Sequence, residues 1–335
     1  MSVRAATDGS GAYLRLDSGM TVHRPDEHAH ATEAHAGATI AHIAAAVDSY
    51  PEGRDATVLG AAIARATGAE MMLLAVEPDL PLIIPGLQRK RVREETEAML
   101  RATAASLAPD ARRTVESDLS IPRGLERMVR AQRRDLLVVG SSRHGPAAQV
   151  SIGRLTRQLL SDLHCGLAIA PRGLSEERPG AGPAALALRR IGVGFDGGPE
   201  ATAALATAAA IATGAGAELV VRGAIDDRVP ALGWPNVWMG AIMDSWEEMM
   251  AEEEELLRAQ LDSAVAALGA RATVEVKRGR PGKLLVALSG HVDLLVVGSR
   301  RWGPLARLLL GGTGEALVHG SHCSLLVVPR PATEH

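Results

Sequence analysis

Residues 135–172 and 293–330 are two copies of one segment, and this duplication is the feature that most constrains how the chain can fold. Equivalent residues are separated by a constant 158 positions, as in Gly140/Gly298, His164/His322 and Cys165/Cys323. Each copy has an apolar run of strand length, a Gly-rich turn, a helical stretch and a second apolar run that ends at Pro-Arg. A Gly-rich turn between a buried strand and a helix start is a common phosphate site in open α/β sheets.

The duplication extends to the residues that precede these segments. Apolar runs predict strands at 39–47, 70–76 and 113–119 in the first copy and at 191–195, 219–224 and 272–277 in the second. Helices are predicted from Pro51 to a stop at Gly68, from Pro199 to Gly214, and at 92–107, 122–132 and 281–288. Strands that alternate with helices predict a parallel sheet covered by helices on both faces.

These patterns divide the chain into four parts. They are a flexible arm at 1–38, a first α/β domain at 39–172, a Pro/Gly-containing linker at 173–188 and a second α/β domain at 189–331. The arm contains His23, His28, His30 and His35, which admit a metal-binding interpretation. A solvated polar arm is favoured, because no helical or turn spacing sets a ligand geometry.

Composition excludes several classes of partner. A formal net charge of -3, from 36 basic and 39 acidic residues, leaves no electrostatic footprint for nucleic acid. No run reaches the ~18 apolar residues that span a membrane, and the N-terminus lacks the apolar core of a signal peptide. The two cysteines occupy equivalent positions of separate copies, so free thiols in a reducing cytoplasm are expected.

Several motifs occur together in both copies. A strand ends in Asp and is followed by Ser/Gly-x-Pro-Glu, GAE precedes the second strand, DLLVVGS precedes the Gly-rich loop, and His-Cys opens the last strand. As a set, these motifs resemble the universal stress protein family over 40–172 and 189–330. The resemblance implies two tandem Rossmann-like domains of the adenine nucleotide alpha hydrolase type, each with a five-stranded parallel sheet. It also implies that the halves pair through their terminal strands with pseudo-twofold symmetry.

The nucleotide-binding branch of that family carries G-x2-G-x9-G-[ST] after the fourth strand, where backbone amides and a helix N-terminus contact phosphate. Here the three glycine positions hold, in order, Gly140, Arg143 and Gly153 in the first copy and Gly298, Arg301 and Gly311 in the second. Gly145 and Gly303 lie in the same loops, and the hydroxyl position holds Arg154 and Gly312, with Thr313 one residue later. Both copies therefore depart from the motif in the same way.

The two arginines leave two hypotheses open. A left-handed backbone would cost a non-glycine residue about 1–2 kcal/mol, so the loop is expected to follow another path if the family's loop uses that conformation. An arginine can itself bind phosphate through its planar donor fork. Either Arg143 and Arg301 contribute to a nucleotide site, or the loops have lost nucleotide binding.

Asp48 and Asp196 favour the first hypothesis, because in the family's nucleotide binders this carboxylate accepts from the adenine amino group. The alternative is that each caps the following helix. By the same resemblance Val76 and Ala224 line the base pocket, although each is also an ordinary core residue.

The function implied is that of a stress-responsive regulator that binds ATP or another adenine nucleotide, with or without Mg²⁺, in at least one half. The alternative is an interaction or dimerisation scaffold with altered loops, and a nucleotide-dependent transferase or hydrolase is the weakest hypothesis. No catalytic pair, nucleophile triad, HExxH or Walker A lysine is found, so we expect no enzyme. Dimerisation of the whole chain stays open.

Overall fold

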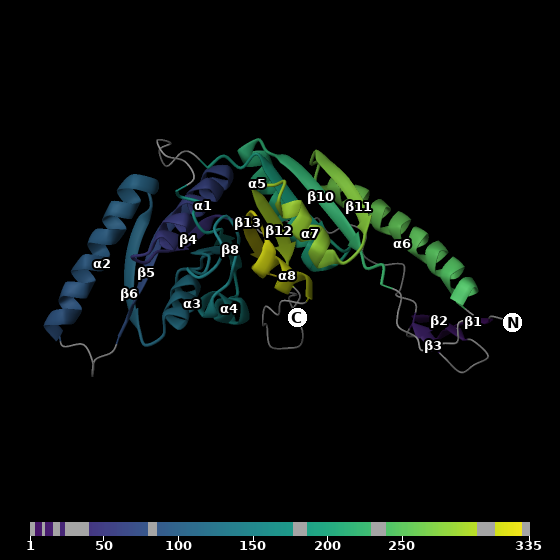
Figure 1. Ribbon diagram of the computed structural model, residues 1–335, viewed down its shortest axis with the longest axis horizontal. Helices are drawn as coiled ribbons and strands as arrows, with labels where there is room; N and C mark the ends of the chain where they lie inside the picture. The colour runs from purple at the N-terminus through teal and green to yellow at the C-terminus, as the bar shows by residue number, and fades with distance from the viewer. Residues whose placement is uncertain are drawn as a thin grey trace. The chain divides into compact units, whose positions relative to one another are not determined.

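The computed structural model describes residues 4–8, 11–15, 21–23, 40–79, 86–176, 186–228, 239–299 and 312–329 (Figure 1). Its contacts divide the chain into two units, Met1–Ala36 and Gly37–His335. In the first unit β1 (Arg4–Asp8), β2 (Gly11–Arg15) and β3 (Thr21–His23) form an antiparallel sheet. The sequence shows only the alternation around β2, since strands as short as β1 and β3 contain too few residues to establish a period.

The second unit is built on one ten-stranded sheet. The first copy contributes β4 (His42–Ala46), β5 (Glu70–Pro78), β6 (Arg112–Asp118), β7 (Leu136–Gly140) and β8 (Gly166–Ala170). The second contributes β9 (Arg190–Phe195), β10 (Glu218–Ile225), β11 (Ala272–Arg278), β12 (Leu294–Gly298) and β13 (Ser324–Val328). The order is β11-β10-β9-β12-β13-β8-β7-β4-β5-β6, with parallel pairing within each half. The predicted pair of five-stranded parallel sheets is confirmed.

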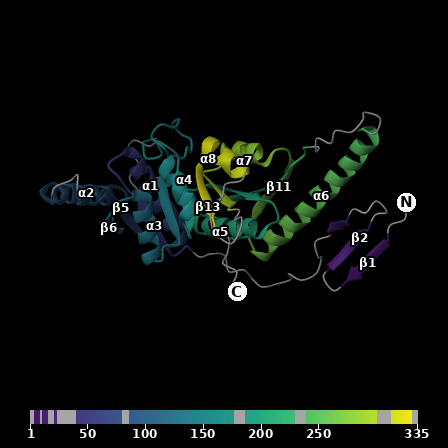
Figure 2. The same ribbon diagram turned by 90° about the horizontal axis from the view of Figure 1, so that it is seen from below.

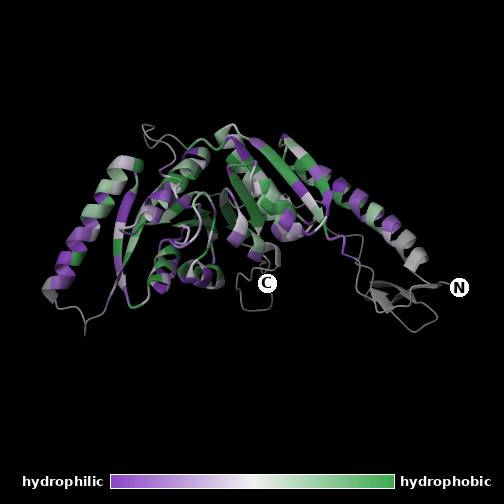
Figure 3. Cartoon of the chain, viewed as in Figure 1, coloured by the Kyte–Doolittle hydropathy of each residue, from purple (hydrophilic) through white to green (hydrophobic). Residues whose placement is uncertain are grey.

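The helices form two layers, each with its own buried apolar cluster. One layer consists of α1 (Pro51–Thr67), α2 (Gly86–Leu107), α5 (Pro199–Ala215) and α6 (Met239–Ala267). The other consists of α3 (Ile121–Ala131), α4 (Arg154–Asp162), α7 (Pro281–Ser289) and α8 (Gly312–Gly320). In Figure 2, α2 lies beside β5 and β6, and α6 lies beside β11. Figure 3 shows purple, hydrophilic residues along α2 and α6 and largely green strands between them.

Local signals position the helix ends as predicted, with two exceptions. Gly68 and Gly216 end α1 and α5 in the left-handed conformation, at φ 72° and 63°, which glycine adopts without strain. The second of these helices therefore continues past Gly214, where the sequence placed its end. The helix predicted at 92–107 begins earlier, at Gly86, because the added residues carry no apolar period from which it could be predicted. The ion pair Lys90–Glu94 joins this added segment to the next turn.

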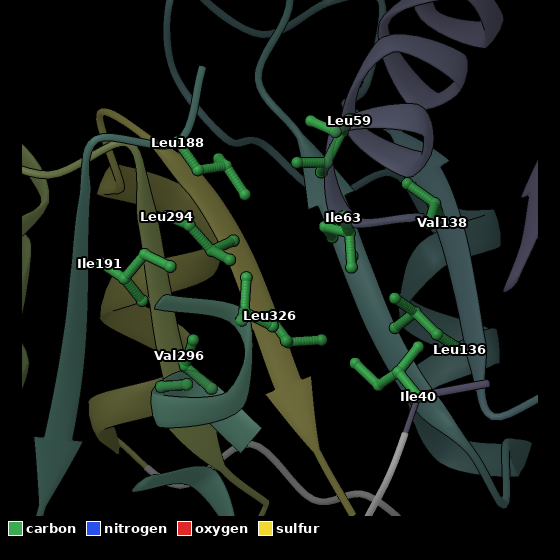
Figure 4. Close-up of a cluster of buried hydrophobic side chains, with 14 of the residues drawn as sticks. Ile40, Leu59, Ile63, Leu136, Val138, Leu188, Ile191, Leu294, Val296 and Leu326 are labelled. Carbon is green, nitrogen blue, oxygen red and sulfur yellow. The ribbon is translucent and has the colours of Figure 1, made fainter. Parts of the chain in front are cut away.

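The two halves join through their terminal strands, as expected from the resemblance. β13 pairs antiparallel with β8, with Leu325 opposite Ile169, Leu326 opposite Ala168 and Val327 opposite Leu167. Antiparallel pairing of equivalent strands is the arrangement that a twofold relation between the halves requires. Figure 4 shows one apolar cluster with residues of both halves, including Leu59, Ile63, Ile191 and Leu326.

The predicted environment of the signature residues at the last strands is also confirmed. Cys165 and Cys323 are buried free thiols, whereas His164 and His322 beside them are exposed. In the part of the chain that the structure describes, no helix is both long and apolar enough to cross a membrane.

Candidate functional site

The carboxyl ends of β4 and β7 form the switch point of the first half. The two strands are parallel neighbours, but β4 leads into α1 on one face of the sheet and β7 leads into α4 on the other. Ligands of open α/β sheets bind where connections diverge in this way. β9 and β12 form the equivalent point of the second half, with α5 and α8 on opposite faces.

Asp48 and Asp196 lie directly after the first strand of each half. Asp48 Oδ1 accepts a hydrogen bond from the Tyr50 amide at 3.1 Å, and Asp196 Oδ1 accepts one from the Gly198 amide at 3.1 Å. Tyr50 and Gly198 are the N-cap residues of α1 and α5, and neither helix has a side-chain cap. Each carboxylate therefore closes the turn before its helix by binding the amide of the N-cap residue, which has no partner within the helix. Binding of a base by either carboxylate stays a prediction.

The electrostatics of Asp48 depend on its neighbours. Desolvation raises the pKa of the Asp48 carboxyl above its ordinary value, and the hydrogen bond from the Tyr50 amide opposes that increase. The charge of Glu52 raises this pKa further, whereas the charge of Arg143 lowers it. Asp48, Glu52 and Arg143 therefore lie within electrostatic range of one another at one end of the sheet.

Arg143 stacks its guanidinium on the ring of Tyr50, 3.7 Å from the ring centroid. Among the described non-glycine residues, only Arg133 and Ala148 have a positive φ, so the loop avoids a left-handed Arg143, as predicted. Tyr50 is a site residue that the sequence motifs do not predict. The sequence does show a difference at this position, because Tyr50 precedes Pro51 in the first copy whereas Gly198 precedes Pro199 in the second.

The first loop, which we define as residues 141–153, is closed by its own backbone. The Ser142 amide donates to the Ser151 carbonyl at 2.6 Å, and the Gly145 amide donates to the Ser142 carbonyl at 3.0 Å. Gly145 is buried, and a Cβ there would lie 2.5 Å from Ser151 Cβ. Gly153 is the N-cap of α4, and its Cβ would meet only ordinary contacts at 3.6 Å. The two glycines therefore serve different purposes, close packing at 145 and a helix start at 153.

The glycine that ends the fourth strand of each half, directly before the loop, packs against the helix that follows the first strand. A Cβ on Gly140 would lie 2.3 Å from the carbonyl oxygen of Glu52, and one on Gly298 would lie 2.5 Å from that of Glu200. Real Cβ atoms do not approach backbone this closely. Both positions therefore require glycine for packing, independently of any phosphate.

Val76 and Ala224 are half-buried near the ends of the second strands, β5 and β10. A Cβ on Gly124 would lie 2.6 Å from Val76 Cγ1, so the start of α3 packs closely on Val76. Both positions are compatible with lining a pocket and with ordinary packing, the two alternatives that the sequence leaves open.

The second half is described in part. Gly312 and Thr313 begin α8, whereas Arg301, Gly303 and Gly311 lie outside the described residues. Gly197 has φ +79°, and a Cβ there would lie 2.6 Å from Oε1 of Gln260, which α6 supplies. The turn after Asp196 is thus covered by a helix side chain, whereas the turn after Asp48 has an aromatic ring and Arg143.

A cavity of about 380 Å³ lies beside the candidate site and not within it. It is lined by the ends of β5 and β6 and by the start of α2. Its lining residues are Glu77, Pro78, Asp79, Arg89, Lys90, Val92, Arg93 and Ser117. None of the residues predicted from the sequence to bind nucleotide lines it.

Comparison with known proteins identifies the repeated unit. The model of the universal stress protein family matches residues 39–171 and 187–329. Universal stress protein Slr1101 of Synechocystis is 34% identical over 110 residues, which cover 32% of this chain and 99% of that protein. Universal stress protein Rv2005c of Mycobacterium tuberculosis is 25% identical over 245 residues, which cover 70% of this chain and 77% of that protein.

Solved structures share the fold across most of the chain. The functionally unknown protein PA1789 of Pseudomonas aeruginosa aligns with a TM-score of 0.60 at 16% identity, covering 88% of this chain and 94% of that one. A universal stress protein of Archaeoglobus fulgidus aligns with a TM-score of 0.58 at 16% identity, covering 87% of this chain and 98% of that one. At this identity the likeness establishes the fold.

Proposed function

The chain belongs to the universal stress protein family, and from that premise we propose that it is a stress-responsive regulator that binds an adenine nucleotide, at least in its first half. One observation carries the proposal: Asp48, Tyr50 and Arg143 lie together where β4 and β7 diverge. The site combines a carboxylate acceptor, an aromatic ring and a cation, which are groups that suit an amino-substituted base and a phosphate.

Each group can make a specific contact with a nucleotide. A carboxylate oxygen has two lone pairs, so Asp48 can hold the Tyr50 amide and still accept from the adenine amino group. Arg143 is exposed, and its planar fork can leave the Tyr50 ring to bind phosphate oxygens in a bidentate manner. The N-terminus of α4 at Gly153 adds amides of the right polarity for an anion.

Magnesium would enter with the triphosphate. Across the described residues, no group of three His, Cys, Asp or Glu could hold a metal ion. The two carboxylates at the site, Asp48 and Glu52, are too few for a magnesium site made of protein ligands alone. Mg²⁺ commonly keeps several waters and uses phosphate oxygens as ligands. We assign the protein no catalytic reaction and a cytoplasmic location, both on the sequence evidence.

A second candidate function is a scaffold that has lost nucleotide binding. Arginine at the second glycine position of both copies favours it, and the close contacts at Gly140 and Gly298 give these glycines a packing role that needs no ligand. The chain would then act through the surface formed by its paired halves and through assembly with a second copy.

The deciding experiment starts from freshly purified protein. Denaturation followed by chromatography should release adenine nucleotide, and ATP with Mg²⁺ should raise the melting temperature more than inorganic triphosphate with Mg²⁺ does. ATP at one hundred times its dissociation constant should add about 2.7 kcal/mol of apparent stability. Absence of both released nucleotide and a melting shift would leave the scaffold as the function.

A further inference from the structure

Arg172 is the last residue of the Pro-Arg pair that closes the first copy, and it contacts the first loop at three points. Its Nη1 donates to the Gly145 carbonyl at 2.9 Å, and its carbonyl accepts from the Ala148 amide at 2.9 Å. Its amide makes a longer hydrogen bond of 3.4 Å to the Gln149 carbonyl. Ala148 has φ 55°, a strained value for alanine, so these bonds hold the loop in a backbone conformation that it would not adopt alone.

Arg172 is itself held by α1. Asp55, which is 0% exposed, accepts hydrogen bonds from the Gly173 amide at 2.8 Å and the Ser175 amide at 2.7 Å. Both amides belong to the turn that begins at Arg172. The turn after β8 is therefore fastened to a buried carboxylate of the helix.

Glu52, one turn earlier on α1, faces the Arg172 guanidinium. Glu52 Oε1 lies 3.9 Å from Arg172 Nε, and the residue is 7% exposed. Its other oxygen, Oε2, is buried without a hydrogen-bond partner. A buried carboxylate oxygen without a donor is costly, and the positive charge of Arg172 beside Oε1 offsets part of that cost.

We infer that Arg172 is a positioning residue of the first site: it links α1, through Glu52 and Asp55, to the loop that carries Arg143. This inference rests on the proposed nucleotide site. Arg172 acts on the ligand through the loop, because its Nη1 already donates to the Gly145 carbonyl and its Nε faces Glu52. The Asp55 part of the link is particular to the first half, since the equivalent residue is Ala203, whereas Glu52 and Arg172 correspond to Glu200 and Arg330.

Two roles for Arg172 predict opposite effects of one substitution. Glu52→Gln removes a negative charge next to the loop. If Arg172 bound phosphate directly, this change would strengthen ATP binding, because the site would become more positive. If Arg172 positions the loop, the same change weakens ATP binding, because the guanidinium loses the carboxylate that orients it.

The experiment measures the dissociation constant of ATP with Mg²⁺ by calorimetry on the full chain. We expect Arg172→Gln to weaken binding about tenfold, the effect of losing its charge-assisted hydrogen bond to the Gly145 carbonyl. Glu52→Gln should weaken binding in the same direction, because it removes the ion pair at 3.9 Å that orients the guanidinium. Arg172→Lys should recover part of the loss, since an ammonium group reaches the Gly145 carbonyl but cannot also face Glu52. Glu253→Gln, at an exposed carboxylate of α6, is the charge-matched control and should leave binding unchanged. Tighter binding by Glu52→Gln overturns the inference.

A second readout needs no nucleotide. Hydrogen exchange of the Ser142, Gly145 and Ala148 amides should accelerate at least tenfold in Arg172→Gln and Glu52→Gln, while amides of the β7 strand keep their protection. Unchanged exchange in both variants would show that Arg172 does not position the loop. If the wild-type protein binds no nucleotide, the proposed function fails and the exchange result still decides this inference. If Arg172→Gln does not fold, Glu52→Gln and Arg172→Lys provide both measurements.

Discussion

The carbonyl oxygen of Glu52 lies so close to the α-carbon of Gly140 that a Cβ at residue 140 would begin 2.3 Å from it. The equivalent pair, Gly298 and Glu200, repeats this contact at 2.5 Å. The start of each first helix thus rests on the end of the fourth strand, and only glycine leaves room for it. The first glycine of the loop motif is a packing requirement as well as a candidate phosphate contact.

Gly140→Ala should therefore destabilise the protein in the absence of any ligand. The added methyl group meets backbone that cannot rotate away, and we expect a loss of about 1–3 kcal/mol in the free energy of unfolding. Denaturant unfolding measures it. Gly312→Ala is the matched control, because its Cβ would meet no atom within 4 Å. Equal stability of the two variants would contradict the packing role.

Gly214→Ala tests the contact between the halves. A Cβ at residue 214 on α5 would lie 1.6 Å from the carbonyl oxygen of Ala66 on α1. Alanine gains about 1 kcal/mol of helix propensity, yet the clash should dominate and lower stability by a net ~1–3 kcal/mol. Gly60→Ala is the control on α1, because its Cβ would meet the end of the flexible Met71 side chain at 2.9 Å and otherwise only ordinary contacts at 3.6 Å, with Ala45 and Val138. A stabilised Gly214→Ala variant would mean that the helices separate at little cost.

The two aspartates decide which half binds nucleotide. Asp48→Ala should abolish the melting shift caused by ATP with Mg²⁺, because the carboxylate that accepts from the base is lost. Its effect without nucleotide should be small, about 1 kcal/mol, the value of one turn hydrogen bond. Asp196→Ala tests the second half in the same assay. A shift that survives Asp48→Ala and disappears in Asp196→Ala would place the site in the second half.

The buried thiols predict a loss of stability in alkali. Burial raises the pKa of Cys165 and of Cys323 from 9.0 to about 12. Above pH 9 the unfolded chain therefore releases thiol protons that the native protein retains, so the free energy of unfolding falls as the pH rises, by up to about 1.4 kcal/mol per pH unit for each thiol.

Replacing both cysteines by alanine isolates the contribution of the thiols to the pH dependence of the free energy of unfolding. The double variant should show a shallower decline in denaturant-measured stability between pH 9 and pH 11 than the wild-type protein, because the tyrosines, lysines and arginines titrate alike in both. Parallel curves would mean that the thiols ionise in the native state. Native protein should also resist a thiol-specific disulfide reagent at pH 8 and react fully once unfolded.

Much of the fold follows from local signals. Helix starts at Pro51 and Pro199 and the stop at Gly68 are set by backbone preferences of single residues, and buried parallel strands appear as continuous apolar runs. The duplication then predicts the tandem domains, and the family resemblance predicts their pairing through β8 and β13. The short strands β1 and β3 are missed because they have no usable period.

The candidate site is predicted less completely. Asp48 and Arg143 follow from motif positions, and the resemblance indicates their chemistry. Tyr50 and Arg172 do not, because the importance of each depends on a contact with a residue far along the chain, 3.7 Å from Arg143 to the Tyr50 ring and 2.9 Å from Arg172 to the Gly145 carbonyl.

Local patterns in the sequence are sufficient to predict a duplicated α/β unit whose Gly-rich loops depart from the family motif, because repeats, periods and helix stops are properties of neighbouring residues. The contacts made by the motif residues, in contrast, are visible only in the folded protein. Gly140 proves to be a packing residue, Asp48 a turn former, and Arg172 the link between α1 and the loop. These roles depend on which atoms of distant residues the folded sheet brings within a few ångströms of one another. The spacing of residues along the chain does not determine those distances.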